Sequence, residues 1–306
     1  MIIVVCPGQG SQTPGFLNPW IEDSASLELL ENLSEAAGTD LIAHGTTSDA
    51  DTIRDTAIAQ PLIVAAGILS LNALRESGHL AQVGGIAGHS VGEFTAAAGA
   101  GILDATDAVT LVGLRGRAMA EAASLVPTGM SAIIGGDLPD ILARLADLSL
   151  SAANYNGGGQ LVVAGEVAAL AALSATPPTG ARVISLPVAG AFHTQYMASA
   201  VEALRIAAAP LIIKDPILTL WTNYDGSVVS DGATFRDLLV GQVASPVRWD
   251  LCMESFHEAG VTGIIEVAPG GALVGLAKRA LKGVPTVAIK TPGDLVAARE
   301  LIDNLR

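Results

Sequence analysis

The sequence predicts an α/β protein in which a small subdomain is inserted into a larger domain built on a parallel sheet. Half of the 306 residues are apolar, 15% are charged and only 4% are aromatic, a balance typical of buried parallel strands covered by helices. Several apolar runs of strand length end in glycine-rich loops, as strands do at the carboxyl edge of such a sheet. One central stretch instead shows the alternation of half-buried strands.

The first apolar run, residues 2–6, is expected to be a central strand because it is continuous rather than alternating. It ends in the loop P-G-Q-G-S-Q at residues 7–12, where α/β sheets usually build their sites. A phosphate-binding loop is not indicated, since no Gly-Lys-Ser/Thr follows. Residues 20–58 are acidic and predict surface helices, and Pro61 is expected in the first turn of a helix that ends at Leu74.

Residues 85–101 predict a short strand, a sharp turn and a helix. Within the turn, G-H-S-V-G at residues 88–92 fits the nucleophile elbow G-x-S-x-G, which makes the large domain α/β-hydrolase-like. The two glycines are needed because the strand and helix backbones pass too close for a Cβ atom. Ser90 would also lie at the positive end of the helix dipole. The alternative interpretation is a glycine-bounded turn with a surface serine.

Two arginines lie in the next predicted helix, residues 105–124, which Asp104 can cap. At about 100° per residue, Arg115 falls in the middle of the apolar stripe of this helix. Arg117 falls on the opposite side near Glu121, where an exposed ion pair is expected. An arginine in a core needs an anion, and either a structural carboxylate or a bound ligand would serve.

The inserted subdomain is expected over residues 128–189, because the order βαββαβ is typical of a ferredoxin-like fold. The large domain then consists of residues 1–127 and 190–306. The expected subdomain strands are 130–135, 150–155, 160–164 and 182–188, with helices over 138–148 and 166–175. After it we expect a helix over 195–208, buried strands over 217–221 and 263–267, and a helix ending at 281.

The net charge of −14 argues against nucleic acid or an anionic membrane as the main partner. An anionic ligand therefore needs a local basic site. One stretch, residues 275–290, contains no acid and carries Lys278, Arg279, Lys282 and Lys290.

Cys6 and Cys252 form no C-x-x-C pair, and the amino terminus lacks the pattern of a signal peptide, so we expect a cytoplasmic protein. No stretch reaches the length needed to span a bilayer, and the nearest one, residues 61–69, is expected to be a buried helix. No metal is expected, because no two of the five histidines have ligand spacing.

A serine nucleophile needs a base, and His193 is the best candidate because it lies in a turn of small residues where the insertion ends. His89 is adjacent to Ser90 and points elsewhere, so it is expected to be a packing residue. The other three histidines, in polar contexts, are expected at the surface: His44, His79 and His257.

Five motifs together carry a resemblance that each alone would not. The chain resembles the malonyl-CoA:acyl carrier protein transacylases, closest to those of actinobacterial type II fatty acid synthesis, over essentially its whole length. The motifs occur in the family's order and spacing at residues 7–12, 88–93, 114–117, 191–193 and 266–270.

The resemblance implies that Ser90 is the nucleophile and His193 its base. It further implies that the main-chain carbonyl of Gln242 orients the histidine, which explains why no triad carboxylate stands out. The oxyanion hole would consist of the backbone N–H groups of Val91 and Gln9.

The same resemblance assigns residues to the acyl group. Arg115 would bind the free carboxylate of the substrate bidentately. Asn154 and Asn156 would line the subdomain side of the site, although turn residues before a glycine run are an equal explanation. Phe192, together with the aliphatic Val91, would reject a methyl branch on the substrate.

The implied reaction is transfer of a malonyl group from malonyl-CoA to the phosphopantetheine thiol of acyl carrier protein, through a malonyl-serine, for fatty acid or polyketide synthesis. The implied partners are acyl carrier protein and coenzyme A, with no cofactor, nucleic acid or membrane, and we expect a monomer. Because the carrier is acidic, docking is expected on Lys278, Arg279 and Lys282, with Arg182 or Arg205.

Two rival functions stay open. A serine hydrolase, such as a lipase or patatin-like esterase, shares the elbow but predicts a carboxylate partner for the histidine and no buried arginine. A carrier-binding module that has lost catalysis predicts no covalent adduct on Ser90.

Overall fold

The computed structural model describes residues 1–188 and 190–305. The sheet of the large domain is parallel throughout. The strands are, in spatial order, β10 (Thr286–Ala288), β9 (Gly263–Glu266), β1 (Ile2–Cys6), β2 (Gly85–Gly88) and β7 (Thr219–Trp221). Cys6 pairs with Gly88 and Val5 with Glu266, so the carboxyl ends of the three middle strands come level. The loops that follow them therefore meet at one edge of the sheet.

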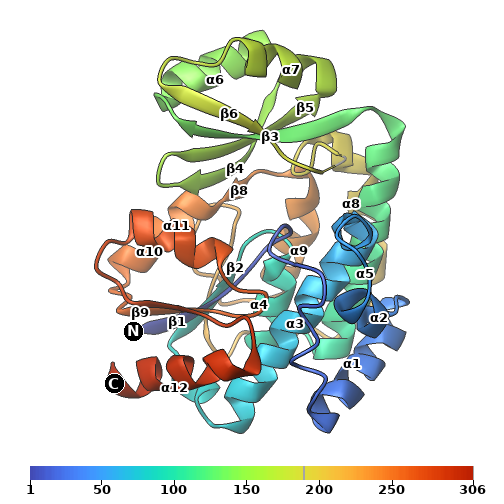
Figure 1. The fold of residues 1–306 in the computed structure, drawn as a ribbon, viewed down its shortest axis with the longest axis vertical. Coiled ribbons are helices and arrows are strands. Elements are labelled where there is room, and N and C mark those ends of the chain that lie inside the picture. The colour runs from blue at the N-terminus through green and yellow to red at the C-terminus, as the bar shows by residue number, and fades with distance from the viewer. Residues whose placement is uncertain (189, 306) are drawn as a thin grey trace.

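Helices cover both faces of this sheet (Figure 1). Val4 packs into the core on one face and Ile3 into the core on the other, because successive strand side chains alternate. The first face is covered by α1 (Ser24–Ala37), α2 (Leu41–Thr46), α3 (Thr56–Glu76), α4 (Gly92–Gly99), α5 (Ala105–Leu125), α8 (Ala198–Ala208), α9 (Gly232–Gly241) and α12 (Leu295–Asn304). The second is covered by α10 (Trp249–Glu258) and α11 (Ala272–Ala280).

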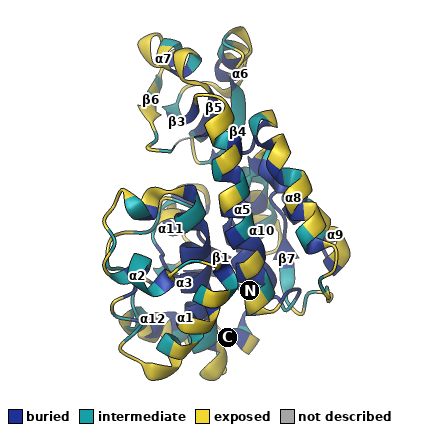
Figure 2. Cartoon of the chain, turned by 90° about the vertical axis from the view of Figure 1, so that its right-hand side faces the viewer, coloured by how far each residue is buried: buried dark blue, intermediate teal, exposed yellow. Residues whose placement is uncertain are grey.

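Burial follows this layering, and the outward faces of α8 and α9 are exposed (Figure 2). Short 3-10 turns connect the elements: η1 (Thr52–Arg54), η2 (Leu80–Gln82), η3 (Gln195–Met197), η4 (Gln242–Ala244) and η5 (Pro292–Asp294). The predicted helix over 195–208 is therefore split, with η3 preceding α8.

The inserted segment forms a second sheet above the first (Figure 1). Its elements follow the predicted βαββαβ order: β3 (Thr128–Gly135), α6 (Leu138–Asp147), β4 (Ser151–Gly157), β5 (Gln160–Glu166), α7 (Val167–Ala175) and β6 (Ala181–Ser185). The spatial order is β6-β3-β5-β4, and these four strands pair antiparallel. The predicted domain boundaries touch Ala189 and Arg306, which lie outside the described residues.

A strand from the carboxyl-terminal part of the chain extends this second sheet. β8 (Val247–Arg248) pairs parallel with β4, with Asn154 opposite Val247. The sequence did not predict this strand. It ties the insertion to the segment that follows η4, so the two parts of the molecule share a sheet as well as a chain.

Helix α3 corrects two predictions. It begins at Thr56 rather than at Pro61, because the Asp55 carboxylate accepts a hydrogen bond from Ala57 N at 2.8 Å and caps the helix there. Pro61 therefore lies inside the helix, where burial on all sides outweighs the missing hydrogen bond. At 21 residues, α3 is long and apolar enough to cross a membrane, contrary to the prediction, but 78% of its apolar window is buried within the protein.

Two further predictions are wrong in detail. Strand β7 begins at Thr219, since the side chain of Ile217 is exposed and does not continue the sheet. Arg117 does not pair with Glu121; its Nη1 donates to the carbonyl of Ala37 at 2.8 Å and satisfies the carboxyl end of α1.

Candidate active site

The turn between β2 and α4 has the geometry of a nucleophile elbow. Ser90 has a φ of 53°, a left-handed conformation that is strained for any residue with a side chain. A Cβ atom on Gly88 would collide with the backbone of Gly92, and one on Gly92 with the carbonyl of Cys6. Both glycines are therefore required sterically, for the reason that the sequence pattern suggested.

His193 faces the serine. Its Nε2 lies 2.7 Å from Ser90 Oγ, and its Nδ1 lies 2.9 Å from the main-chain carbonyl oxygen of Gln242. The carbonyl can only accept, so Nδ1 carries the proton and Nε2 is the free base. Burial, followed by the positive charge of Arg115, lowers the pKa of His193 to about 3. The imidazole is thus neutral at physiological pH.

The serine and histidine open into a cavity of about 170 Å³ between the carboxyl edge of the parallel sheet and the second sheet. The predicted residues that line it with them are Gln9, Val91, Arg115, Asn154, Asn156 and Phe192. Gln242 lies behind this wall, in contact with its members. Lys278, Arg279 and Lys282 are not part of the lining.

Arg115 is a buried cation held by neutral groups. Only 1% of the residue is exposed. Its Nη1 donates to Gln60 Oε1 at 2.7 Å and its Nη2 to Gln242 Oε1 at 2.9 Å, while Nε has no partner among the described residues. Burial lowers the pKa of Arg115 to about 10, and the nearby Glu93 acts in the opposite direction.

The ion pairs of the described residues do not include Arg115. A structural carboxylate in direct contact, one of the two explanations open from the sequence, is therefore not what holds this arginine. The charge borders a cavity of small-ligand size, and an anion there would complete its coordination.

His89 is more than the packing residue that was predicted. Its Nε2 lies 2.8 Å from Asn156 Oδ1, and Asn156 Nδ2 donates to Gln160 Oε1 at 3.0 Å. The imidazole therefore links the elbow to the second sheet. Asn154 lies in the same wall, and its Oδ1 is buried without a partner among the described residues.

Three buried residues around the site were missed in the sequence: Gln60, Glu93 and Asn223. Glu93 is 1% exposed, and burial raises its pKa to about 8. An acid in the first turn of a helix has an ordinary explanation in the helix dipole, so its position just after the elbow gave little signal. Asn223 follows β7, far along the chain from the elbow, and only the fold brings it there.

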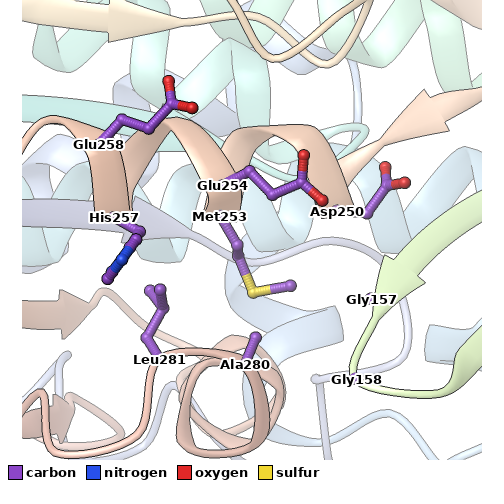
Figure 3. A pocket seen from close by; sticks show the side chains of 9 residues that line it. All are labelled: Gly157, Gly158, Asp250, Met253, Glu254, His257, Glu258, Ala280 and Leu281. Atoms are coloured by element: carbon purple, nitrogen blue, oxygen red, sulfur yellow. The ribbon is translucent and has the colours of Figure 1, made fainter.

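A wider cleft of about 460 Å³ lies between α10 and the end of α11 (Figure 3). Three carboxylates on α10 line it, namely Asp250, Glu254 and Glu258, opposite Ala280 and Leu281. This wall would repel an anionic ligand. The chemistry therefore belongs to the smaller cavity at Ser90.

Together, the fold and the site define an α/β enzyme in which a serine–histidine pair and a buried arginine border the same small cavity. The family described as acyl transferase domain matches residues 3–293. A malonyl CoA-acyl carrier protein transacylase of Mycobacterium tuberculosis is 49% identical over 296 residues, which cover 96% of this chain and 98% of that protein. The chain belongs to the malonyl CoA-acyl carrier protein transacylases, within the acyl transferase family.

Solved structures agree with this membership. The crystal structure of MCAT from Mycobacterium tuberculosis is 48% identical and superposes with a TM-score of 0.95, covering 98% of this chain and 99% of that one. A malonyl-transacylase solved in complex with its type II PKS acyl-carrier protein is 30% identical, with a TM-score of 0.91 over 98% of this chain and 99% of that one.

Proposed function

We propose that this protein transfers a malonyl group from malonyl-CoA to the phosphopantetheine thiol of acyl carrier protein through a malonyl ester of Ser90. The observation that carries the proposal is the position of Arg115. It is a buried guanidinium that has no carboxylate partner in the described part of the chain, and it lines the same cavity as the Ser90–His193 pair. The names of the relatives, malonyl CoA-acyl carrier protein transacylases, support the same activity.

The first half-reaction forms the acyl-enzyme. His193 Nε2 takes the proton of Ser90 Oγ, and the oxygen attacks the thioester carbonyl carbon. When the tetrahedral intermediate collapses, the carbon–sulfur bond breaks and the coenzyme A sulfur receives the proton from His193. A malonyl ester remains on Ser90.

The second half-reaction reverses these roles with a different thiol. His193 takes the proton of the phosphopantetheine thiol, and the thiolate attacks the Ser90 ester. The serine oxygen leaves and recovers its proton from His193. Because one histidine serves both half-reactions, no net acid or base is consumed, and the second thiol must reach the position that coenzyme A has left.

The tetrahedral oxyanion is assigned to the backbone N–H groups of Val91 and Gln9. Both residues line the cavity, and neither N–H has an acceptor among the described residues. Val91 N is also the first N–H of the turn into α4, so the helix dipole favours negative charge beside it. Losing one oxyanion donor typically costs about 10²–10³ in rate.

Selection of malonyl over acetyl follows from the same arginine. An acyl group without a carboxylate would leave the Arg115 cation buried with only two amides as partners, which is unfavourable. Phe192 and Val91 line the cavity and would crowd a methyl branch on the acyl α-carbon. We therefore propose malonyl over methylmalonyl, by about 1–3 kcal/mol for one methyl group.

Acyl carrier protein is the second substrate, and we propose that it docks on the exposed Lys278, Arg279 and Lys282 at the end of α11. Of the two arginines that could extend this surface, Arg205 is paired with Glu202 at 2.5 Å, whereas Arg182 is exposed and forms no ion pair among the described residues. We further propose a cytoplasmic monomer that needs no cofactor. Its two cysteines are buried and free, as suits a reducing compartment.

A serine hydrolase is the remaining rival, and two features count against it. The partner of His193 is the carbonyl of Gln242 rather than a carboxylate, and a hydrolase has no need of the buried Arg115. Intact-protein mass spectrometry after mixing with malonyl-CoA separates the cases. A malonyl adduct on Ser90 that disappears when carrier protein is added supports transfer. Release of free malonate without any carrier would favour a hydrolase. If no adduct forms at all, the protein would instead be a carrier-binding module.

A further inference from the structure

We propose that Glu93 is a positioning residue for acyl selection: its carboxylate fixes the side-chain amide of Gln242 and thereby holds Arg115 ready for the acyl carboxylate. The inference rests on the proposed function and names a residue that acts through others. Glu93 does not line the substrate cavity and is not placed in contact with the reacting atoms.

Gln242 is the residue through which Glu93 would act, because it contacts each member of the site. Its main-chain oxygen accepts from His193 Nδ1 at 2.9 Å. Its side-chain Nε2 donates to the Ser90 carbonyl oxygen at 3.1 Å, and its Oε1 accepts from Arg115 Nη2 at 2.9 Å. The orientation of this one amide therefore decides whether Arg115 meets an acceptor or a donor.

Glu93 selects that orientation. Both Glu93 oxygens act as acceptors: Oε1 accepts from Asn223 N, and Oε2 accepts from Gln242 Nε2. Arg115 can only donate, and it faces Gln242 Oε1. The amide thus lies between a carboxylate and a guanidinium. Turning it over would set donor against donor at Arg115 and acceptor against acceptor at Glu93.

The other carboxylate oxygen of Glu93 is anchored to the body of the protein. Asn223 N donates to Glu93 Oε1 at 2.6 Å. The side chain of Asn223 holds the elbow, because its Oδ1 accepts from Ser90 N and its Nδ2 donates to the Gly88 carbonyl, both at 2.7 Å. Asn223 thus positions the Ser90 turn for any acyl group, whereas Glu93 positions Arg115 through Gln242.

The electrostatics agree with this geometry. Glu93 and Arg115 are both buried, and Glu93, when ionised above its pKa of about 8, favours the charged form of Arg115 across the Gln242 amide. Losing the Glu93 acceptor would free the Gln242 amide to turn over and present its donor to Arg115. Without substrate, the Arg115 guanidinium would then lose its hydrogen bond to Gln242 Oε1 and shift. The carboxylate of an entering malonyl group would not find it in the binding position.

The test is Glu93→Gln, which keeps the shape but lets the side chain donate to Gln242 and so permits the reversed amide. Acylation of Ser90 by malonyl-CoA and by acetyl-CoA is followed by mass spectrometry in wild type and variant. We expect kcat/KM for malonyl-CoA to fall about 10- to 100-fold, mainly through KM, with acetyl-CoA changed less than about threefold. Equal losses for both thioesters, or no loss, would overturn the proposal.

Glu266→Gln is the matched control. Glu266 is another fully buried acid, and it accepts hydrogen bonds from Leu273 N and Val274 N at 3.0 and 2.9 Å, outside the site. Its loss should lower the melting temperature without changing the ratio of malonyl to acetyl rates. A ratio that falls equally in both variants would mean that any buried acid matters, which contradicts a specific role for Glu93.

If Glu93→Gln does not fold, Glu93→Asp replaces it. The shorter carboxylate cannot reach both Asn223 and Gln242, so the malonyl-to-acetyl ratio should still fall, and an unchanged ratio would overturn the proposal. The wild-type arm separates this inference from the proposed function. A wild type that takes up no malonyl group refutes the function, whereas a selective wild type with equally selective variants refutes only the role of Glu93.

Discussion

Ser90 and His193, whose side chains lie 2.7 Å apart, both have left-handed backbone conformations, with φ values of 53° and 61°. Such conformations cost roughly 1–2 kcal/mol for residues with side chains, so the surroundings must hold them. Asn223 Oδ1 accepts from Ser90 N at 2.7 Å, and Val243 O accepts from His193 N at 3.2 Å. The nucleophile and its base are thus fixed by separate segments before any substrate arrives.

Replacing Ser90 by alanine should abolish the malonyl adduct and reduce transfer by at least about 10⁴-fold, because among the described residues Ser90 Oγ is the hydrogen-bond partner of His193 Nε2. Mass spectrometry of the intact chain and of its peptides checks this. An adduct of equal yield in the variant would place the acyl group elsewhere.

Arg115→Lys should lose most of the preference for malonyl-CoA. A lysine keeps the charge but cannot donate to Gln60 and Gln242 while also offering two parallel bonds to a carboxylate. We expect the malonyl-to-acetyl ratio of kcat/KM to fall by about 100-fold, or about 2.7 kcal/mol. Arg117→Lys, one of the neighbouring positions on the same helix, is the control and should leave that ratio unchanged. A lysine variant as selective as wild type would contradict the role of Arg115.

The acid limb of the pH–rate profile should lie well below the range of an ordinary histidine. The pKa of His193 is lowered to about 3, so the free base is present throughout the neutral range. Acylation of Ser90 by malonyl-CoA, measured from pH 4.5 to 8 in a rapid-quench experiment, should show no loss centred near pH 6.5. A half-maximal rate at about pH 6.5 would mean that His193 titrates like an exposed histidine.

Glu93 should make the folded state less stable as the pH rises. Its pKa is about 8 in the folded protein, above the ordinary glutamate value of 4.5, so the folded state binds an extra proton between these two pH values. The stability from this group is fully present below about pH 4.5 and is lost as the pH rises through about 8. Urea unfolding of wild type and Glu93→Gln over this window checks the sign, since the variant should show a flatter dependence.

Alanine at Gly88 or Gly92 should destabilise the fold by more than about 3 kcal/mol, because the added methyl group meets backbone that cannot move aside. Gly275→Ala is the control, since this glycine lies in α11 with open space at its Cβ. It should gain up to about 1 kcal/mol. Thermal unfolding compares the three variants, and similar melting temperatures would contradict the close approach at the elbow.

Reversal of Lys278, Arg279 and Lys282 to glutamate should raise the KM for acyl carrier protein and leave acylation by malonyl-CoA unchanged. The same number of reversals at exposed or partly exposed positions off α11, namely Arg75, Lys214 and Arg236, controls for the change in net charge. The carboxylates that line the cleft beside α11 would repel an acidic carrier, so the three basic residues must outweigh this repulsion for docking to occur here. Unchanged carrier kinetics in the first variant would move the docking surface elsewhere.

Local chemistry made much of this protein predictable from its sequence. The elbow is predictable because the steric need for Gly88 and Gly92 arises within five residues. The fold class is predictable because continuous and alternating apolar runs distinguish buried parallel strands from half-buried ones. Helical periodicity alone placed Arg115 in an apolar stripe, and it is buried.

Tertiary structure alone decided what these residues contact. Arg115 meets Gln60 and Gln242, which are 55 and 127 positions away, and no periodicity relates them. The same holds for the bond between Asn223 and Glu93, and for the pairing of β8 with β4. Each contact joins residues far apart in the sequence, and no short motif or periodic pattern around either residue indicates its partner. The sequence therefore determined which groups could do chemistry, and the fold determined how a buried charge, an amide and a strained serine are held together.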